Sequence, residues 1–279
     1  MKILIADSGS TKTDWVLVGE NGQVVEQVAT AGMNPYHQTD EELVSILKTT
    51  PWTTQESGEE MTLYFYGSGC TPVQIPRLRE ILVRNLTNVS VCDVYSDLVG
   101  AARAVCGHQE GVACILGTGA NSCLYDGEQI VQNTPALGYI LGDEGSGAVL
   151  GRKFLNAMYK GRLPLELKEC FEKEYQLTMA DVIQRVYREP MANRFRASLS
   201  LFIGKHLDVP ELRQLVVENF REFLRLNVQP YHRPELPVGF VGSMASHYEK
   251  ELREAVRLEG FVVGAVMKSP MEGLIRYLF

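Results

Sequence analysis

The stretch that decides the fold is GVACILGTGANSCLYDGEQIVQNTPALGYILGDEGSG, residues 111–147. Its apolar run at 112–116 predicts a buried strand, which ends in the small-residue turn GTGANS. The pair Asp126 and Gly127 is a strong hairpin signal, and LGDEGSG at 141–147 leads into an apolar helix. Glycine turns beside a strand end or a helix start present N–H groups to anions, so this stretch predicts an anion-binding site.

A second glycine turn lies at the start of the chain, where KILIADSGSTKTDWVLV (residues 2–18) predicts a strand, a tight turn and a strand. Gly9 allows close approach of the backbone to a ligand, and the hydroxyls around it are donors. Asp7, at the strand end, is placed to hold a hydrated Mg²⁺ near phosphates. No Walker motif GxxxxGK[ST] is present, and the turn joins two strands. The alternative is a hairpin without a ligand, but a second such turn in the chain favours phosphate binding.

Around these turns the chain alternates strands and helices. In the first part we expect strands at 23–28, 61–66 and 89–94, a polar surface loop at 51–60, and helices of about ten residues from Thr39 and over 73–86. In the second part we expect strands at 112–116, 122–125 and 129–131, followed mainly by helices over 146–227. After these we expect a strand, a glycine turn and a helix over 236–257, then an extended segment at 261–266. Pro270 is expected to begin a final helix. A three-strand meander therefore occurs twice, which indicates an internal duplication with mixed sheets.

Composition narrows the functional classes. The 279-residue chain is 45% hydrophobic and 22% charged, as in ordinary globular proteins. Its net charge of −7 and the absence of a basic patch argue against nucleic acid as a partner. No apolar stretch approaches the roughly 18 residues of a membrane span, and the six scattered cysteines fit a reduced cytoplasm. The five histidines show no ligand spacing, so no metal cluster is expected.

Three separated motifs carry a resemblance that extends over nearly the whole chain. DSGSTKTDW (residues 7–15) resembles the first phosphate loop of the actin/hexokinase/Hsp70 superfamily, and LGTGANSCLYDG (116–127) resembles the second. LGDEGSG is typical of the N-acetylglucosamine kinase family, which is grouped with the BadF/BadG/BcrA/BcrD ATPases. The resemblance implies an α/β protein with two ribonuclease-H-like, actin-like ATPase domains, each with a mixed five-stranded sheet flanked by helices, and a nucleotide in the interdomain cleft. The implied domains are 1–108 with the C-terminal helix 267–279, and 109–266 with a helical insert.

The resemblance also assigns binding residues. For ATP and Mg²⁺ it implies Asp7 (to the metal, through water), Gly9, Ser10, Thr11, Lys12, Thr13, Gly117, Thr118, Gly119, Gly242 and Ser243. For the sugar it implies Asn34, Asp97, Gly138 and Asp143. Each has a structural alternative: Asn34 can shape the turn before Pro35, Asp143 and Glu144 can stabilise a helix start, and Ser243 can cap a helix. For Glu144 both roles, sugar ligand and helix stabilisation, stay open.

Asp97 is the predicted general base. It lies where a strand passes into a helix of small residues, and the family places its base at the matching position. A hydroxyl nucleophile needs a carboxylate within hydrogen-bond reach to take its proton. The alternatives are that Asp97 only caps the helix, or that Asp93 is the base. The chain departs from the family pattern at Leu98, where Ala is usual, and around Leu137 and Tyr139, which leaves the pocket for an acyl-amide group undefined.

The resemblance thus implies an ATP-dependent kinase that phosphorylates the 6-hydroxyl of an amino sugar, with N-acetylglucosamine favoured over glucosamine, N-acetylmannosamine and N-acetylmuramic acid. It also implies a homodimer. One alternative is an ATPase that activates an electron-transfer partner, although Cys123 and Cys170 lack the pattern expected around a shared iron–sulfur cluster. Another is a non-catalytic nucleotide- or sugar-binding regulator, which the absence of a preceding helix-turn-helix pattern disfavours.

Overall fold

The structure, a computed structural model, describes residues 2–9, 11–53 and 60–279. The chain divides into two compact units, Met1–His108 with Pro270–Phe279 (unit 1) and Gln109–Ser269 (unit 2). Each unit has its own five-stranded sheet and its own hydrophobic core. Ser10 and most of the expected polar loop, residues 54–59, lie outside the described residues.

The sheet of unit 1 has the strand order β3-β2-β1-β4-β5. Its strands are β1 (Lys2–Ser8), β2 (Lys12–Val18), β3 (Val24–Ala31), β4 (Met61–Gly67) and β5 (Val89–Ser96). The first three form an antiparallel meander, while β4 and β5 run parallel to β1. Because β1, β4 and β5 are parallel, their carboxyl ends meet at one edge of the sheet.

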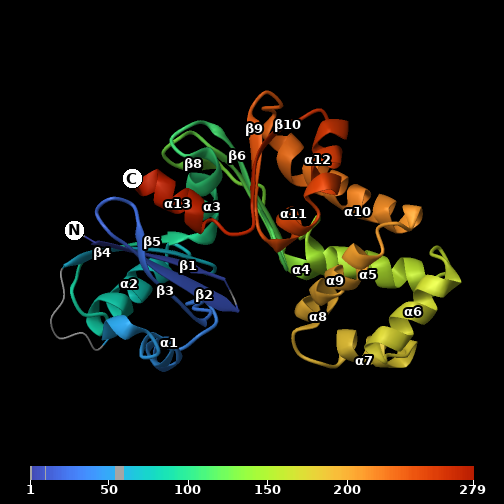
Figure 1. The fold of residues 1–279 in the computed structure, drawn as a ribbon, viewed down its shortest axis with the longest axis horizontal. Helices are drawn as coiled ribbons and strands as arrows, with labels where there is room; N and C mark the ends of the chain where they lie inside the picture. The colour runs from blue at the N-terminus through green and yellow to red at the C-terminus, as the bar shows by residue number, and fades with distance from the viewer. Residues whose placement is uncertain (1, 10, 54–59) are drawn as a thin grey trace. The chain divides into compact units, whose positions relative to one another are not determined.

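Helices cover both faces of this sheet. They are α1 (Asp40–Leu47), the 3₁₀ turn η1 (Pro51–Thr53), α2 (Gln74–Asn85), α3 (Asp97–Cys106) and α13 (Met271–Leu278). Helices α1 and α2 lie on one face, and α3 and α13 on the other (Figure 1). Thr39 explains where α1 begins, because it forms a reciprocal capping box with Glu42. Trp15, Trp52 and Phe65 are fully buried and pack together in the core on the α1–α2 side.

Unit 2 repeats the same sheet with different connections. Its strand order is β10-β9-β6-β7-β8, built from β6 (Gly111–Leu116), β7 (Ala120–Tyr125), β8 (Ile130–Gln132), β9 (Pro237–Val241) and β10 (Val262–Met267). The first three strands are antiparallel, and β9 and β10 run parallel to β6, as β4 and β5 do to β1. The internal duplication and the α/β class with two mixed five-stranded sheets are therefore confirmed.

Most of the chain between β8 and β9 is helical. The elements there are α4 (Gly138–Leu141), α5 (Gly147–Tyr159), α6 (Leu165–Tyr175), α7 (Met179–Tyr187), α8 (Ala192–Ser198), α9 (Ser200–Lys205), α10 (Pro210–Phe223), the π-helical segment η2 (Leu224–Val228) and the 3₁₀ turn η3 (Gln229–Tyr231). After β9 come α11 (Ser243–His247) and α12 (Glu249–Leu258). A large core of aromatic and aliphatic side chains joins these helices to the sheet.

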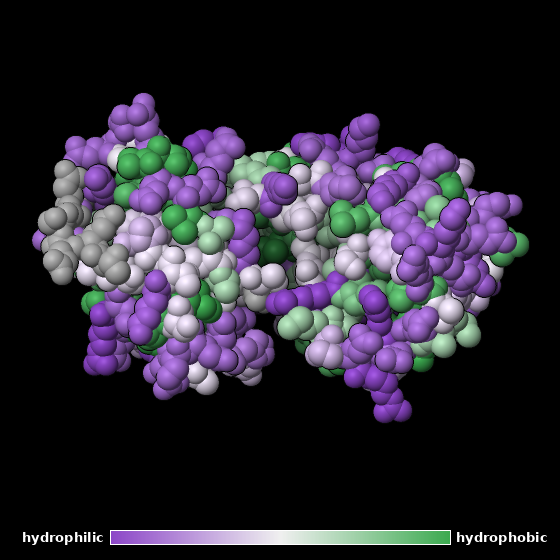
Figure 2. All heavy atoms as spheres, turned by 60° about the horizontal axis from the view of Figure 1, so that its bottom comes forward, coloured by the Kyte–Doolittle hydropathy of each residue, from purple (hydrophilic) through white to green (hydrophobic). Residues whose placement is uncertain are grey.

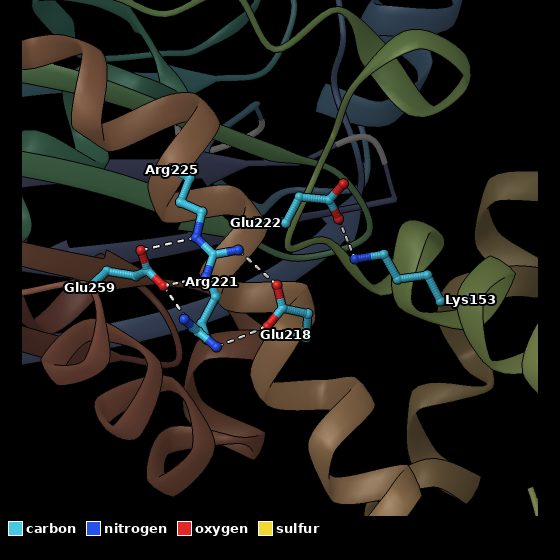
Figure 3. A network of polar contacts seen from close by, with 6 residues as sticks. All are labelled: Lys153, Glu218, Arg221, Glu222, Arg225 and Glu259. Carbon is cyan, nitrogen blue, oxygen red and sulfur yellow. Dashed lines mark hydrogen bonds and ion pairs between the residues drawn. The ribbon is translucent and has the colours of Figure 1, made fainter.

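Ion pairs fix the end of α10 against α12 (Figure 3). Glu259 accepts from Arg221 (2.6 Å) and from Arg225 (2.8 Å), and both arginines also pair with Glu218. Lys153 of α5 pairs with Glu222 on the same helix as Arg221. Such a network, with partly buried members, holds the start of the π-helical segment in place more firmly than isolated surface pairs can.

Most predicted elements are confirmed to within three residues, and three details are wrong. One helix was expected after Gly242, but the chain breaks at Tyr248 into α11 and α12. Pro270 is the N-cap of α13 and not part of its first turn. The short helix α4 was not predicted, since a single turn leaves no periodic pattern to detect.

Polar side chains predominate on the face shown in Figure 2, and apolar residues form smaller groups between them. Within the described part of the chain, no helix is both long and apolar enough to cross a membrane. The described residues also include no group of three or more His, Cys, Asp or Glu side chains arranged for a metal ion. All six cysteines are free thiols, and Cys170 is exposed.

Candidate functional site

Unit 1 brings polar residues together at the carboxyl ends of its three parallel strands. Ser8 of β1 pairs in register with Gly67 of β4, which pairs with Ser96 of β5. The residues that follow these three positions are therefore neighbours on one edge of the sheet, where ligands of α/β proteins usually bind. They are Gly9, Ser68 and Asp97.

Asp97 begins α3, but it does not cap this helix. The cap is Ser96, whose hydroxyl accepts from the N–H of Val99 (3.3 Å). One carboxylate oxygen of Asp97 accepts from the N–H of Leu98 (2.9 Å), and the backbone N–H of Asp97 itself also interacts with the carboxylate. Burial raises the pKa of Asp97, against the effect of the Leu98 N–H. Backbone N–H groups thus orient the carboxylate, and no described side chain donates to it, so it remains available to a hydroxyl group as a general base must be.

Asp7 lies close enough to Asp97 for the two charges to interact. Burial raises the pKa of Asp7 to about 7, and repulsion from Asp97 and then Asp14 adds to this, while Lys12 opposes it. Lys12, however, is mostly exposed and pairs with Asp14 (2.6 Å). Acidic side chains gathered with so little compensating positive charge fit a nearby cation.

Asn34 lies beside the same strand ends. It is 9% exposed, and its side-chain oxygen accepts from the N–H of Tyr36 (3.0 Å), which shapes the turn at Pro35. Its amide nitrogen makes only a long contact to the Ser68 hydroxyl (3.4 Å). The side-chain oxygen of Asn34 therefore shapes the turn, whereas its amide N–H groups make only this one long hydrogen bond. Gly69, with a φ of +75°, lies directly against this amide, since a Cβ there would be 2.0 Å from the Asn34 oxygen.

The hydroxyls of the first turn differ in their availability. Ser8 and Thr13 are fully buried, and their hydroxyl oxygens lie 2.7 Å apart; one of the two donates to the other, and Met33 O (3.0 Å from Ser8) and Ala31 O (3.2 Å from Thr13) are the acceptors within reach of the remaining proton. These two hydroxyls stabilise the turn and do not present themselves to a ligand. Gly9 and Thr11 are exposed beside them, and Gly9 N–H donates to Lys12 O (2.9 Å) to close the turn.

The second glycine turn, in unit 2, presents free backbone donors. The N–H groups of Gly147 and Ala148, at the start of α5, donate to the carbonyls of Gly117 (2.8 Å) and Thr118 (3.2 Å). Gly117 N–H donates to Gly119 O, whereas the N–H groups of Thr118 and Gly119 have no acceptor among the described residues. A Cβ at Gly117 would meet nothing within 4 Å, so there is open space at the turn. The turn therefore has the donors and the room to bind an anion.

Asp143 lies against this turn. A Cβ at Gly119 would be 3.0 Å from one carboxylate oxygen of Asp143, and the other oxygen accepts from the N–H of Ala120 (3.2 Å). Burial raises the pKa of Asp143, and the Ala120 N–H opposes this. Helix α5 is capped by Ser146, whose hydroxyl accepts from Val149 N–H, so Asp143 is not the N-cap of this helix.

The glycine turn after β9 joins the same group of residues. Gly242 has a φ of +129°, and a Cβ there would be 2.2 Å from Leu116 O, so this turn packs on the end of β6 next to Gly117. Ser243 is exposed at the first position of α11 and is not its cap. Gly138 is exposed at the start of α4, which it closes by accepting from Gly142 N–H (2.8 Å).

Two residues near Asp143 were not predicted from the sequence. Asn227, in the π-helical segment, donates to Glu144 (3.1 Å) and accepts from the Ser122 hydroxyl through its carbonyl (3.0 Å). Arg196 of α8 is 7% exposed, and its charge lowers the pKa of Asp143. No local motif marks either residue, because both reach Asp143 or Glu144 from helices far along the chain.

We compared the chain with known proteins to see which family shares these features. No family model matches the chain, and neither does any curated protein. Among solved structures, a protein from Porphyromonas gingivalis designated "putative N-acetylglucosamine kinase" shares 49% sequence identity, with a TM-score of 0.94 over 99% of this chain and 98% of that one. The chain belongs to the N-acetylglucosamine kinase family.

Two more distant structures show the extent of the fold. A protein of the same designation from Chromobacterium violaceum is 18% identical, with a TM-score of 0.77 over 100% of this chain and 99% of that one. A glucokinase of the ROK family from Streptomyces griseus, solved with glucose and AMPPNP, is 13% identical, with a TM-score of 0.54 over 98% of this chain and 97% of its own. At these identities the likeness concerns the fold alone.

Proposed function

We propose that this protein is an ATP-dependent kinase that phosphorylates the 6-hydroxyl of an amino sugar, with N-acetylglucosamine as the first candidate. Membership of the family, based on 49% identity over nearly the whole chain, supports a sugar kinase. The observation that carries the chemistry is Asp97, a carboxylate at the carboxyl end of β5 that backbone N–H groups at the start of α3 orient and to which no described side chain donates.

In the proposed reaction, Asp97 accepts the proton of the sugar 6-hydroxyl. The sugar oxygen then forms a bond to the γ-phosphorus of ATP, the bond from that phosphorus to the β–γ bridging oxygen breaks, and ADP leaves. Asn34 and Asp143 are proposed to bind sugar hydroxyls, the first through its incompletely used amide N–H groups and the second through its carboxylate. Gly138, near Asp143 in the chain, is proposed as a further sugar contact.

The nucleotide is assigned to the glycine turns. Thr118 and Gly119 offer free N–H groups to phosphate oxygens, and Gly242 and Ser243 offer a backbone that a purine or ribose can approach. In unit 1 the proposed contacts are Gly9, Thr11 and Lys12; Thr13 supports the turn through its buried hydroxyl, and Ser10 lies outside the described residues. Asp7 would hold Mg²⁺ through water, and the ion would neutralise phosphate charge.

The test is a coupled assay of ADP release with N-acetylglucosamine, glucosamine, N-acetylmannosamine, N-acetylmuramic acid and glucose. We expect turnover with at least one amino sugar, and a loss of about 10²-fold or more in kcat for Asp97→Asn. Asp93→Asn is the matched control, since Asp93 lies on the same strand β5 and is also partly buried. No turnover on the whole panel, or equal losses for the two variants, would contradict the proposal.

A further inference from the structure

A cavity of about 560 Å³ lies among the helices of unit 2, apart from the glycine turns. Residues of α4, α5, α7 and α8 line it, together with Lys160 and Ala192 at the helix ends. Its volume is within the range of pockets that bind small molecules, roughly 300–1,000 Å³. Nothing in the proposed kinase reaction uses this cavity.

Two polar groups in the lining are buried without a partner. Arg196 is 7% exposed, and while its Nε donates to Ala192 O (3.3 Å), its Nη2 has no hydrogen-bond partner among the described residues. The hydroxyl of Tyr159 is likewise buried and unpaired. A buried unpaired donor is costly, and a charged one more so, and for that reason native proteins rarely leave one without a hydrogen-bond partner, whether protein, water or ligand. Both residues line the cavity, although the two unpaired atoms themselves have no exposed surface, so an anion pairs with them only after these side chains turn toward it.

The charge of the cavity points to the sign of its ligand. Arg152, Lys160 and Arg196 contribute positive charge, and the described lining includes no Asp or Glu. Carboxylates do lie near it: Asp143 acts on Arg196, and Glu172 and Asp181 act on Tyr159. Arg152 and Lys160 form no ion pair with any described residue. Burial, and next the charge of Arg152, lowers the pKa of Arg196, while Tyr139 and then Asp143 oppose this, so the two guanidinium groups repel each other and Asp143 compensates only in part. This concentration of positive charge stands out in a chain whose net charge is −7.

The rim of the cavity is apolar. Ile140, Ile183 and Tyr187 are 71%, 52% and 75% exposed, although apolar and aromatic side chains of this size are usually more buried. The ring of Tyr139 lies 5.0 Å from the Arg196 guanidinium and so flanks the charge. A ligand with an apolar body would cover these side chains while its charged group reached Arg196.

We infer that this cavity binds a small organic anion, a carboxylate or phosphate monoester, whose charged group pairs with Arg196 and Tyr159 and whose apolar body packs against Ile140, Ile183 and Tyr187. A planar guanidinium suits both kinds of oxyanion. The inference does not depend on the proposed kinase reaction, and binding alone tests it.

The experiment measures binding of benzoate, hexanoate and phenyl phosphate by calorimetry and ligand-observed NMR, with neutral benzamide as control. We expect saturable binding with a Kd of about 0.1–1 mM for at least one anion, at least about tenfold tighter than for benzamide. Comparing the affinities of benzoate and hexanoate with that of phenyl phosphate shows whether the site prefers a carboxylate or a phosphate group. Absence of saturable binding, or equal affinity for benzamide, overturns the inference.

Variants locate the site. Arg196→Met is expected to weaken binding about tenfold or more, and Tyr159→Phe about threefold, whereas Lys173→Gln, which removes an exposed charge outside the cavity, leaves it within about twofold. If Arg196→Met does not fold, Tyr159→Phe and Arg152→Gln decide the question. Binding that these variants leave unchanged, or that AMPPNP abolishes, overturns the inference, because the anion would then occupy another site.

Discussion

The two sheets of this protein have the same strand order and directions, yet the groups at their strand ends differ in charge. In unit 1 the ends of β1 and β5 bear the carboxylates of Asp7 and Asp97. In unit 2 the turns after β6 and β9 bear glycines and free N–H groups. The comparison teaches that one duplicated scaffold can bear carboxylates at the strand ends of one copy and unpaired backbone N–H groups in the corresponding turn of the other.

The largest effect is expected from Gly242→Ala in unit 2. The new Cβ would meet Leu116 O at 2.2 Å, and a φ of +129° strains any L-residue. We expect the free energy of unfolding to fall by about 2–4 kcal/mol and the KM for ATP to rise about tenfold or more. Urea denaturation and ATP titration measure both.

Gly117→Ala is the matched control, because its Cβ meets nothing within 4 Å. Stability should change by less than about 1 kcal/mol, while the added methyl group still obstructs a phosphate and raises the KM for ATP. If neither variant altered ATP binding, the glycine turns of unit 2 would not be the anion site, and the contrast between the sheets would have no functional meaning.

Asp7→Asn is expected to act in the opposite direction on stability. The pKa of Asp7 is about 7 in the folded protein against 3.8 for an ordinary Asp. A raised pKa means that the folded state keeps a proton which the unfolded state releases, so stability is lost as the pH rises from about 4 to 7. Asn mimics the protonated form and should stabilise the protein by about 1–3 kcal/mol at pH 8, but by little at pH 4.

Urea denaturation at the two pH values measures this difference. Asp14→Asn serves for comparison: it loses the partly exposed ion pair with Lys12 but also removes the repulsion of Asp7, so stability should change by at most about 1 kcal/mol in either direction. If the difference in the free energy of unfolding between wild type and Asp7→Asn did not become smaller at pH 4, the raised pKa of Asp7 would not be the cause of that difference.

Gly69→Ala tests unit 1 with a smaller effect. Its Cβ would overlap the Asn34 side-chain oxygen at 2.0 Å, so Asn34 must move. We expect the KM for the sugar to rise about tenfold with the KM for ATP nearly unchanged. Gly161→Ala, with a φ of +68° and no atom within 4 Å of its Cβ, isolates the cost of the backbone conformation and should leave the sugar KM unaltered.

The smallest effect is expected from Cys170→Ser. Cys170 is an exposed thiol whose sulfur lies 3.7 Å from a nitrogen of His206. If the protein is a kinase that needs no iron–sulfur cluster, kcat should change by less than about twofold. A severe loss of activity would instead support the alternative of an electron-transfer activator, and the comparison of the two strand edges would need another explanation.

The sequence predicted those parts of the structure that local patterns determine. Apolar runs such as 112–116 and the turn at Asp126 and Gly127 gave the strands and hairpins, and three motifs in order gave the fold. Sequence did not show whether Asp97 or Ser96 capped α3, because both side chains can accept from a helix N–H. Nor did it show Arg196 or Asn227, whose contacts depend on the packing of distant helices and leave no periodic trace.

The π-helical segment Leu224–Val228 bears on how deletions would be tolerated. A π-helical turn contains one more residue than an α-helical turn, so removing a single residue there would restore the ordinary winding. The rest of the segment would then rotate by about 100°. Asn227 would swing away from both Glu144 and Ser122, although no residue that touches them had been replaced. In this part of the protein the length of the chain matters as much as the identity of its side chains.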